Sequence, residues 1–96
     1  MLIITNHAKD RLKERCGLPK RAKKRTAEKA LAEGMRHSEC NGRLKRYVDY
    51  LFLSYNLANN IRIYGNYVYI FRYEKLITVM TLPKSFKGAL KKRKQK

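Results

Sequence analysis

The segment from Asn60 to Leu82 restricts the fold most, because β-branched and aromatic residues occupy most of its positions. Gly65-Asn66 interrupts the segment, and a glycine at the first central position suits a type II′ hairpin turn. The pattern predicts three antiparallel strands, over Ile61–Tyr64, Tyr67–Arg72 and Lys75–Leu82.

A two-residue turn sets the register of the first two strands, with Tyr64 opposite Tyr67 and Arg62 opposite Tyr69. Side chains alternate between the two faces of a strand. An aliphatic face therefore holds Ile61, Ile63, Val68 and Ile70. The opposite face holds Arg62, Tyr64, Tyr67, Tyr69 and Phe71. This Arg/Tyr face is either ordinary sheet chemistry or a surface for a ligand, and core packing requires only the aliphatic face.

Glycine and proline punctuate the amino-terminal half and predict two helices, over His7–Cys16 and Pro19–Glu33. Thr5 or Asn6 suits the first N-cap. Gly17 ends the first helix in the way a C′ glycine does, and Gly34 closes the second.

Residues 43–55 fit two interpretations. Six apolar residues follow a helical stripe over three turns, whereas residues 47–53 would also suit a strand. We expect a helix, because the stripe is long. Residues 35–42 and 56–60 are expected to be loops, and Leu2–Ile4 is expected either to join the sheet edge or to pack on the first helix.

Helices followed by strands predict an α+β domain. We expect two to three N-terminal helices packed on one face of a C-terminal antiparallel meander of three to four strands. In this arrangement the helices over 7–16 and 43–55 cover the aliphatic face, and the Arg/Tyr face stays open or is covered only by the tail and loops. Residues 1–83 would form this single domain, and residues 84–96 a basic tail.

The charge of the chain limits its function. Lys and Arg number 24 against seven Asp and Glu, which gives a net charge of +17. Such self-repulsion is offset by a polyanion, and nucleic acid is the first candidate. No apolar stretch is long enough to span a bilayer, and no signal peptide is visible in the opening residues. We expect a cytoplasmic protein with no membrane partner.

The two cysteines are too few for a disulfide framework. A zinc site could be drawn from His7, Cys16, His37 and Cys40, but the first pair does not have a standard ligand spacing. We therefore predict neither a metal nor another cofactor.

Candidate nucleic-acid contacts are basic or aromatic side chains in four places: the two N-terminal helices, the hairpin, residue 43 and the tail. A cluster of cations opens the second helix, at the end where positive charge opposes the helix dipole, so a bound phosphate or a solvated face would explain it. The full set is Arg15, Lys20, Arg21, Lys23, Lys24, Arg25, Arg43, Arg62, Tyr64, Tyr67, Arg72, Lys91, Lys92 and Arg93.

RNA cleavage without a metal needs a base for the 2′-hydroxyl, an acid for the leaving oxygen and cations for the charge that develops at phosphorus. The chain lacks the carboxylate cluster of a two-metal nuclease. His7 is therefore the candidate acid or base, with Arg11 and Tyr69 as the other candidate catalytic residues. The simpler interpretation of His7 is a local hydrogen bond at a helix start.

The motif His7-Ala8-x-x-Arg11-Leu12-x-x-Arg15 lies near the start of the chain. The last strand of the meander ends with a hydrophobic residue followed by the pattern Thr-Val-x-x-Leu-Pro. Over residues 5–83 this layout resembles small, uncharacterised bacterial and phage proteins, which are similar in layout to the RelE-type ribonuclease toxins and their wider barnase–colicin–RelE group. The resemblance implies a compact α+β domain whose sheet face binds RNA, often on the ribosome. It also implies metal-free cleavage and an antitoxin partner. Matching positions are His7, Arg11, Arg15, Arg62, Tyr69 and Arg72.

Three hypotheses follow. The first is an RNA-binding protein that acts as a toxin-like, metal-independent endoribonuclease. The second is a non-catalytic binder or inhibitor of a ribosome or another ribonucleoprotein. The third is a basic module that binds an acidic protein such as an antitoxin.

Overall fold

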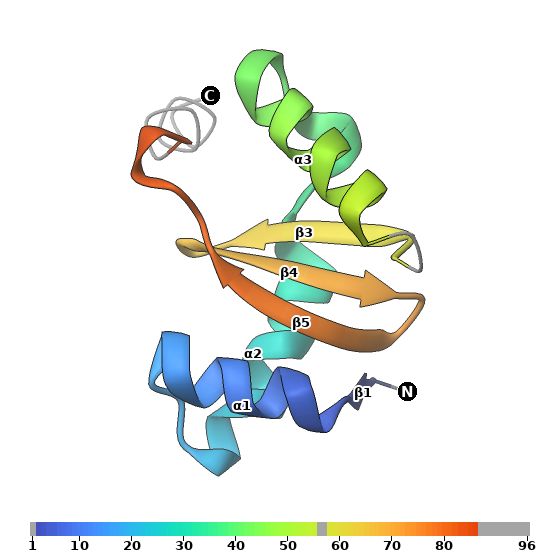
Figure 1. Cartoon of the computed structure of the whole chain (residues 1–96). Coiled ribbons are helices and arrows are strands. Elements are labelled where there is room, and N and C mark those ends of the chain that lie inside the picture. Colours follow the sequence, from blue (N-terminus) through green and yellow to red (C-terminus); the bar gives the residue numbers. More distant parts are fainter. Residues whose placement is uncertain (1, 56–57, 87–96) are drawn as a thin grey trace.

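The computed structural model describes residues 2–55 and 58–86, apart from the side chains of Lys20 and Ser85. Five strands form one mixed sheet in the order β1-β5-β4-β3-β2 (Figure 1). Their bounds are Ile3–Ile4 for β1, Met35–Arg36 for β2, Asn60–Tyr64 for β3, Tyr67–Arg72 for β4 and Lys75–Thr81 for β5. β1 runs parallel to β5, and the other neighbours are antiparallel.

The predicted hairpin register is confirmed, since Tyr64 pairs with Tyr67 and Arg62 pairs with Tyr69. Gly65 adopts φ +63°, which the first central position of a type II′ turn requires. The sheet has five strands rather than three to four. β1 was one of two expected outcomes for its segment. β2 lies in a predicted loop, where its two residues are too short to show any period.

Within the described residues three α-helices accompany the sheet: α1 over Asn6–Cys16, α2 over Lys20–Glu33 and α3 over Gly42–Ser54. Short 3₁₀ helices cover His37–Glu39 and Lys84–Phe86. The Thr5 side chain caps α1 by accepting a hydrogen bond from the Ala8 N–H at 3.1 Å. The helical interpretation of residues 43–55 is confirmed, and so is the α+β class with N-terminal helices packed on the C-terminal sheet.

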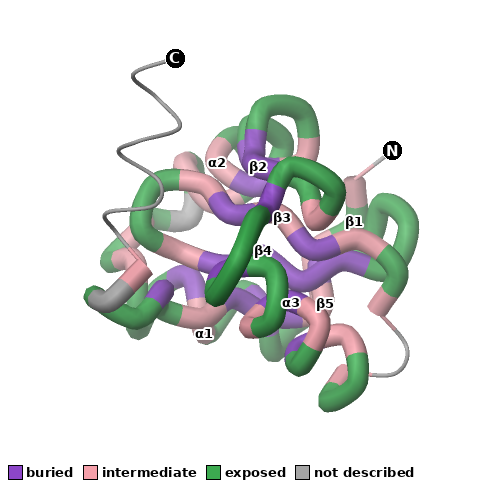
Figure 2. The backbone as a smooth tube through the Cα atoms, turned by 90° about the horizontal axis from the view of Figure 1, so that it is seen from above, coloured by how far each residue is buried: buried purple, intermediate pink, exposed green. Residues whose placement is uncertain are grey.

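The helices occupy both faces of the sheet, and the expectation of an open Arg/Tyr face is wrong. α3 covers the aliphatic face, whereas α1 and α2 cover the face that carries Tyr69 and Phe71 (Figure 1). Buried residues consequently run along the central strands, while peripheral turns and outer helix surfaces are exposed (Figure 2). α1 was expected on the aliphatic face beside α3 and lies on the other side.

Side-chain volume explains this distribution. Apart from Leu12, the fully buried residues of α1 and α2 are the alanines Ala8, Ala27 and Ala30, and the large rings of Tyr69 and Phe71 fill the space that these alanines leave. α3 instead brings larger aliphatic side chains against the shorter strand residues of the aliphatic face. Within the described residues no helix is long and apolar enough to cross a membrane.

Candidate nucleic-acid interface

His7, Arg11 and Arg15 recur every four residues on α1 and therefore share one side of that helix. The His7 Nε2 lies 3.1 Å from the Thr78 Oγ1, in a hydrogen bond whose donor depends on the imidazole tautomer. The Arg15 guanidinium donates to the Val79 carbonyl oxygen at 3.1 Å. Both ends of the α1 row are thus attached to β5.

This row lies beside an otherwise incomplete sheet edge. β1 pairs only with Lys75 and Leu76 of β5, so the rest of β5 has no strand neighbour on that side among the described residues. Arg15 occupies one outward carbonyl of this edge, a device that discourages edge-to-edge association. Arg11, in the middle of the row, forms an ion pair with Glu14 at 2.6 Å.

Tyr69 does not belong to this exposed row, because only 1% of its surface is exposed. Burial is the main reason that the pKa of its phenol is raised, and the neighbouring Cys16 adds to the effect. The phenol therefore stays neutral and inside the core. The structure places Tyr69 in the core rather than on the open Arg/Tyr face that the sequence predicts.

The other polar groups of the Arg/Tyr face are directed at helix ends. The Tyr67 hydroxyl donates to the Arg15 carbonyl oxygen at 3.0 Å, in the last turn of α1. The Arg62 guanidinium donates to the Gly34 carbonyl oxygen at 3.1 Å, at the C-cap of α2. Burial, aided by the charge of Arg36, lowers the pKa of Arg62. Tyr64 is half-buried against the same cluster, so these three residues serve the packing of α1 and α2.

The cations that open α2 are exposed to a greater degree. Arg21, Lys24 and Arg25 are exposed and Lys23 is half-buried, while the side chain of Lys20 lies outside the described parts. The first turn of α2 contains no acidic residue, and no side chain caps it. Among the described side chains, none of the ion pairs involves a cation of α2.

The remaining predicted contacts are scattered. The Arg43 guanidinium lies over the Phe86 ring on the α3 side, 5.6 Å from its centroid. Arg72 lies at the far end of β4, near the Tyr73 ring. Lys91, Lys92 and Arg93 fall outside the described residues. The structure thus brings the α1 and α2 cations into one layer and places Arg43 and Arg72 elsewhere.

Two features of the structure are not predicted by the sequence pattern. Tyr73, in the β4–β5 turn, is 71% exposed, although nothing in the strand pattern marks it as different from a solvated loop residue. The His37 Nε2 and the Asp49 Oδ1 lie 2.5 Å apart in a hydrogen bond, and the Phe52 ring centroid lies 5.1 Å from that of the imidazole. The helical period of α3 places Asp49 on its polar side. It does not predict a contact with His37, which lies in the turn before the helix.

No group of three or more His, Cys, Asp or Glu side chains that could hold a metal occurs in the described part of the chain. No protein-family model, curated relative or solved structure matches this chain.

Proposed function

We propose that this protein binds RNA in the cytoplasm through the exposed basic surface of α1 and α2. Over Asn6–Glu33 ten Lys and Arg accompany four Asp and Glu. Besides Arg15, which is hydrogen-bonded to β5, six of these cations are exposed and have no ion pair among the described side chains: Lys9, Lys13, Arg21, Lys24, Arg25 and Lys29. This unneutralised charge in one helical layer is the observation that carries the proposal.

Phosphate contact explains the distribution of this charge better than a solvated face does. Three of the cations lie in the first two turns of α2, where the helix dipole disfavours positive charge. A neighbouring phosphate would be attracted both to these cations and to the helix N-terminus, and its binding would release condensed counterions. RNA, rather than DNA, is favoured by the resemblance to RelE-type ribonucleases.

A matched pair of triple variants tests this proposal. The first is Arg21→Gln, Lys24→Gln and Arg25→Gln on α2. The control is Arg43→Gln, Lys45→Gln and Arg46→Gln, which removes the same charge from the first turns of α3 across the sheet. Binding of an unstructured RNA of about 20 nucleotides, long enough for a typical single-strand site, is measured by anisotropy over a range of salt concentrations.

The α2 triple variant should weaken binding and lower the slope of log affinity against log salt by about 2, because each lost phosphate contact removes roughly 0.7. The α3 triple variant should change both quantities much less. Equal losses in the two variants would show that net charge alone is at work, and the interface would be wrong. Equal affinity for DNA would remove the preference for RNA, and negligible RNA affinity at about 0.15 M salt would favour an acidic protein partner.

His7 supports a second candidate function, metal-independent cleavage of the bound RNA. Its imidazole is on the exposed side of α1, is oriented by Thr78, and lies in the same row as Arg11 and Arg15. In this reaction His7 takes the proton of a 2′-hydroxyl, whose oxygen attacks phosphorus. The bond from phosphorus to the 5′-oxygen breaks, the leaving oxygen takes a proton from water, and a 2′,3′-cyclic phosphate remains.

The His7→Gln variant separates cleavage from binding. With chelator present, the wild-type protein should produce cyclic-phosphate ends, and the variant should lose this activity while its RNA affinity stays unchanged. Arg11→Ala should reduce cleavage further than binding, because its charge would act on the reacting phosphate. If the wild type leaves RNA intact, the protein is a binder only. If the variant cleaves as fast as the wild type, His7 is not the catalytic base.

A further inference from the structure

The β4–β5 turn holds a tyrosine in a backbone conformation that suits glycine. Tyr73 and Glu74 connect the paired residues Arg72 and Lys75. Tyr73 adopts φ +54° and is the only non-glycine residue with positive φ in the described part of the chain. The first central position of a two-residue turn with this pattern is normally glycine. A bulky residue here stores strain, and such strain is concentrated at functional sites.

Neighbouring groups maintain this conformation without burying the ring. The Asn59 side-chain oxygen accepts a hydrogen bond from the Tyr73 N–H at 2.6 Å. The ring remains 71% exposed, so burial of apolar surface does not compensate for the strain. The Arg72 guanidinium carbon lies 5.8 Å from the ring centroid, which gives an aromatic surface with a cation at its side.

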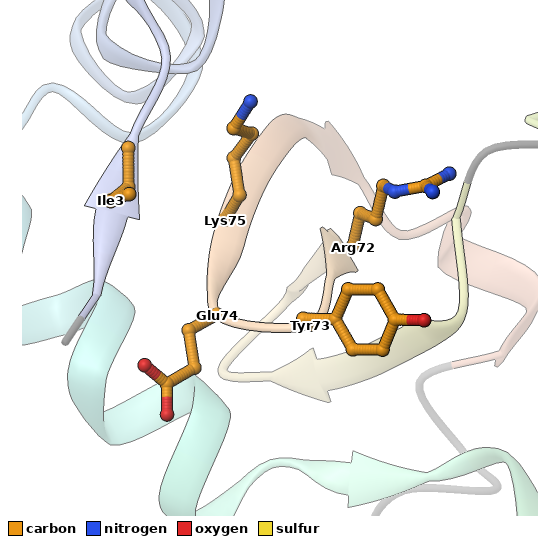
Figure 3. Close-up of a pocket in the computed structure, with 5 residues that line it drawn as sticks. All are labelled: Ile3, Arg72, Tyr73, Glu74 and Lys75. Carbon is orange, nitrogen blue, oxygen red and sulfur yellow. The ribbon is translucent and has the colours of Figure 1, made fainter.

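Two open cavities meet at the Arg72–Lys75 pair. The first has a volume of about 500 Å³ and is lined by that pair together with Ile3, Tyr73 and Glu74 (Figure 3). The second, of about 350 Å³, lies on the side of α3. Besides Arg72 and Lys75, it is lined by residues that include Thr5, Ser54 and Tyr55, each of which carries a hydroxyl. Both volumes fall in the range of small-ligand pockets.

The charges around the turn are separated by side. Arg72 and Lys75 extend to the same side of the hairpin, whereas the Glu74 carboxylate points to the opposite side (Figure 3). An anion is therefore attracted to the Arg72–Lys75 side, where the Ser54 hydroxyl of the second cavity can also donate a hydrogen bond. The exposed Tyr73 ring lies next to this anion position.

We infer that the β4–β5 turn binds one nucleotide of single-stranded RNA, with an unpaired base stacked on Tyr73 and the adjoining phosphate between Arg72 and Lys75. An acidic peptide would satisfy the two cations but would leave the strained tyrosine without a role. A planar base uses both features, and stacking on an exposed aromatic ring is the common mode of single-strand binding. The inference rests on the proposed RNA binding but uses a separate surface from the cations of α1 and α2.

The Tyr73→Gly variant tests the site without endangering the fold, because glycine is the residue that this backbone conformation favours. Binding of a fluorescent hexauridylate is measured by anisotropy, alongside an abasic hexamer with the same phosphates. Tyr73→Phe retains the ring. Tyr50→Ala is the control, since Tyr50 is another tyrosine with 64% exposure, on α3.

Tyr73→Gly should weaken hexauridylate binding by roughly five- to a hundredfold, which corresponds to the loss of one stacked base. Tyr73→Phe should restore the affinity, Tyr50→Ala should leave it unchanged, and the abasic hexamer should bind wild type and Tyr73→Gly equally. Unchanged binding in Tyr73→Gly, an equal loss for the abasic hexamer, or no binding by the wild type would each overturn the inference.

The two surfaces can fail separately in these experiments. If the α2 triple variant weakens binding of the longer RNA while Tyr73→Gly binds hexauridylate normally, only the nucleotide site is wrong. If Tyr73→Gly loses base-dependent binding while the α2 triple variant behaves like its α3 control, the nucleotide site stands and the α1–α2 interface is wrong.

Discussion

The two faces of the sheet are covered by opposite means. On one face, α3 brings large aliphatic side chains to a strand surface of Ile and Val. On the other, two alanine-bearing helices meet strands that carry tyrosine, phenylalanine and arginine. On the α1–α2 face the large rings come from the strands and the fully buried helix residues are alanines and one leucine, Leu12, whereas on the α3 face the helix contributes several large aliphatic side chains.

The polar groups at the ends of the strand side chains on the α1–α2 face form hydrogen bonds with helix ends. The last carbonyl groups of a helix lack partners within the helix, and two strand side chains supply them. Tyr67 donates to a carbonyl at the end of α1, and Arg62 donates to the C-cap carbonyl of α2. A polar and aromatic strand face can therefore be an internal surface that fastens helix ends, and its composition alone does not identify a binding floor.

Truncation of Tyr69 gives the largest expected effect. Tyr69→Ala should lower the free energy of unfolding by about 3–5 kcal/mol, because it removes a fully buried ring that the small helix residues cannot replace. Ile70→Val, one methylene removed on the α3 face, should cost only about 0.5–1.5 kcal/mol. Both values come from urea unfolding. A cost below about 0.5 kcal/mol for Tyr69→Ala would mean that the ring faces solvent after all.

Arg62→Met tests the fastening of α2. The variant keeps the apolar stem but leaves the Gly34 carbonyl without its charged donor, and we expect a loss of about 1.5–3 kcal/mol in the free energy of unfolding. Arg46→Met, at an exposed position of α3, should stay within about 0.5 kcal/mol of the wild type. RNA affinity should fall equally in both variants, since each removes one positive charge. A loss of RNA affinity in Arg62→Met but not in Arg46→Met would show that Arg62 contacts RNA.

Local patterns in the sequence were sufficient for most of the secondary structure. The turn at Gly65 defines the hairpin register, and the glycines after α1 and α2 mark the helix ends. The assignment of helices to faces was not predictable in the same way, because it depends on volumes that meet only in three dimensions. The small residues of α2 were visible in the sequence, and their match to a ring-bearing strand face was the signal that could have revealed it.

The candidate site likewise has one part that local sequence predicts and one part that depends on the three-dimensional fold. The four-residue spacing of His7, Arg11 and Arg15 is a local property, and the structure does place them on one side of α1. The positive φ of Tyr73 is imposed by strand pairing on both sides of its turn. A tyrosine gives no hint of that conformation, in contrast to the glycine at position 65.

The raised pKa of Tyr69 predicts a pH dependence for the α1–α2 face. Above the ordinary tyrosine pKa of about 10, the unfolded chain releases this proton while the folded chain retains it. The folded state then binds more protons, so stability falls as pH rises, by at most about 1.4 kcal/mol per pH unit for this one group. Urea unfolding between about pH 9 and 11 should show a smaller decline for Tyr69→Phe than for the wild type. Parallel curves would show that the phenol ionises in the fold.

Tyr67→Phe gives the smallest expected effect and isolates the fastening of α1. The ring and its packing remain, and only the hydrogen bond to the Arg15 carbonyl is lost. Because this bond is exposed, water can replace the hydroxyl, and the loss should be near the lower end of about 0.5–1.5 kcal/mol. The control is Tyr50→Phe, whose hydroxyl is on the exposed side of α3 and should contribute nothing measurable. Hydrogen exchange at the end of α1 should increase in Tyr67→Phe while exchange in α3 stays the same, and a uniform increase would mean that the hydroxyl stabilises the whole fold rather than one helix end.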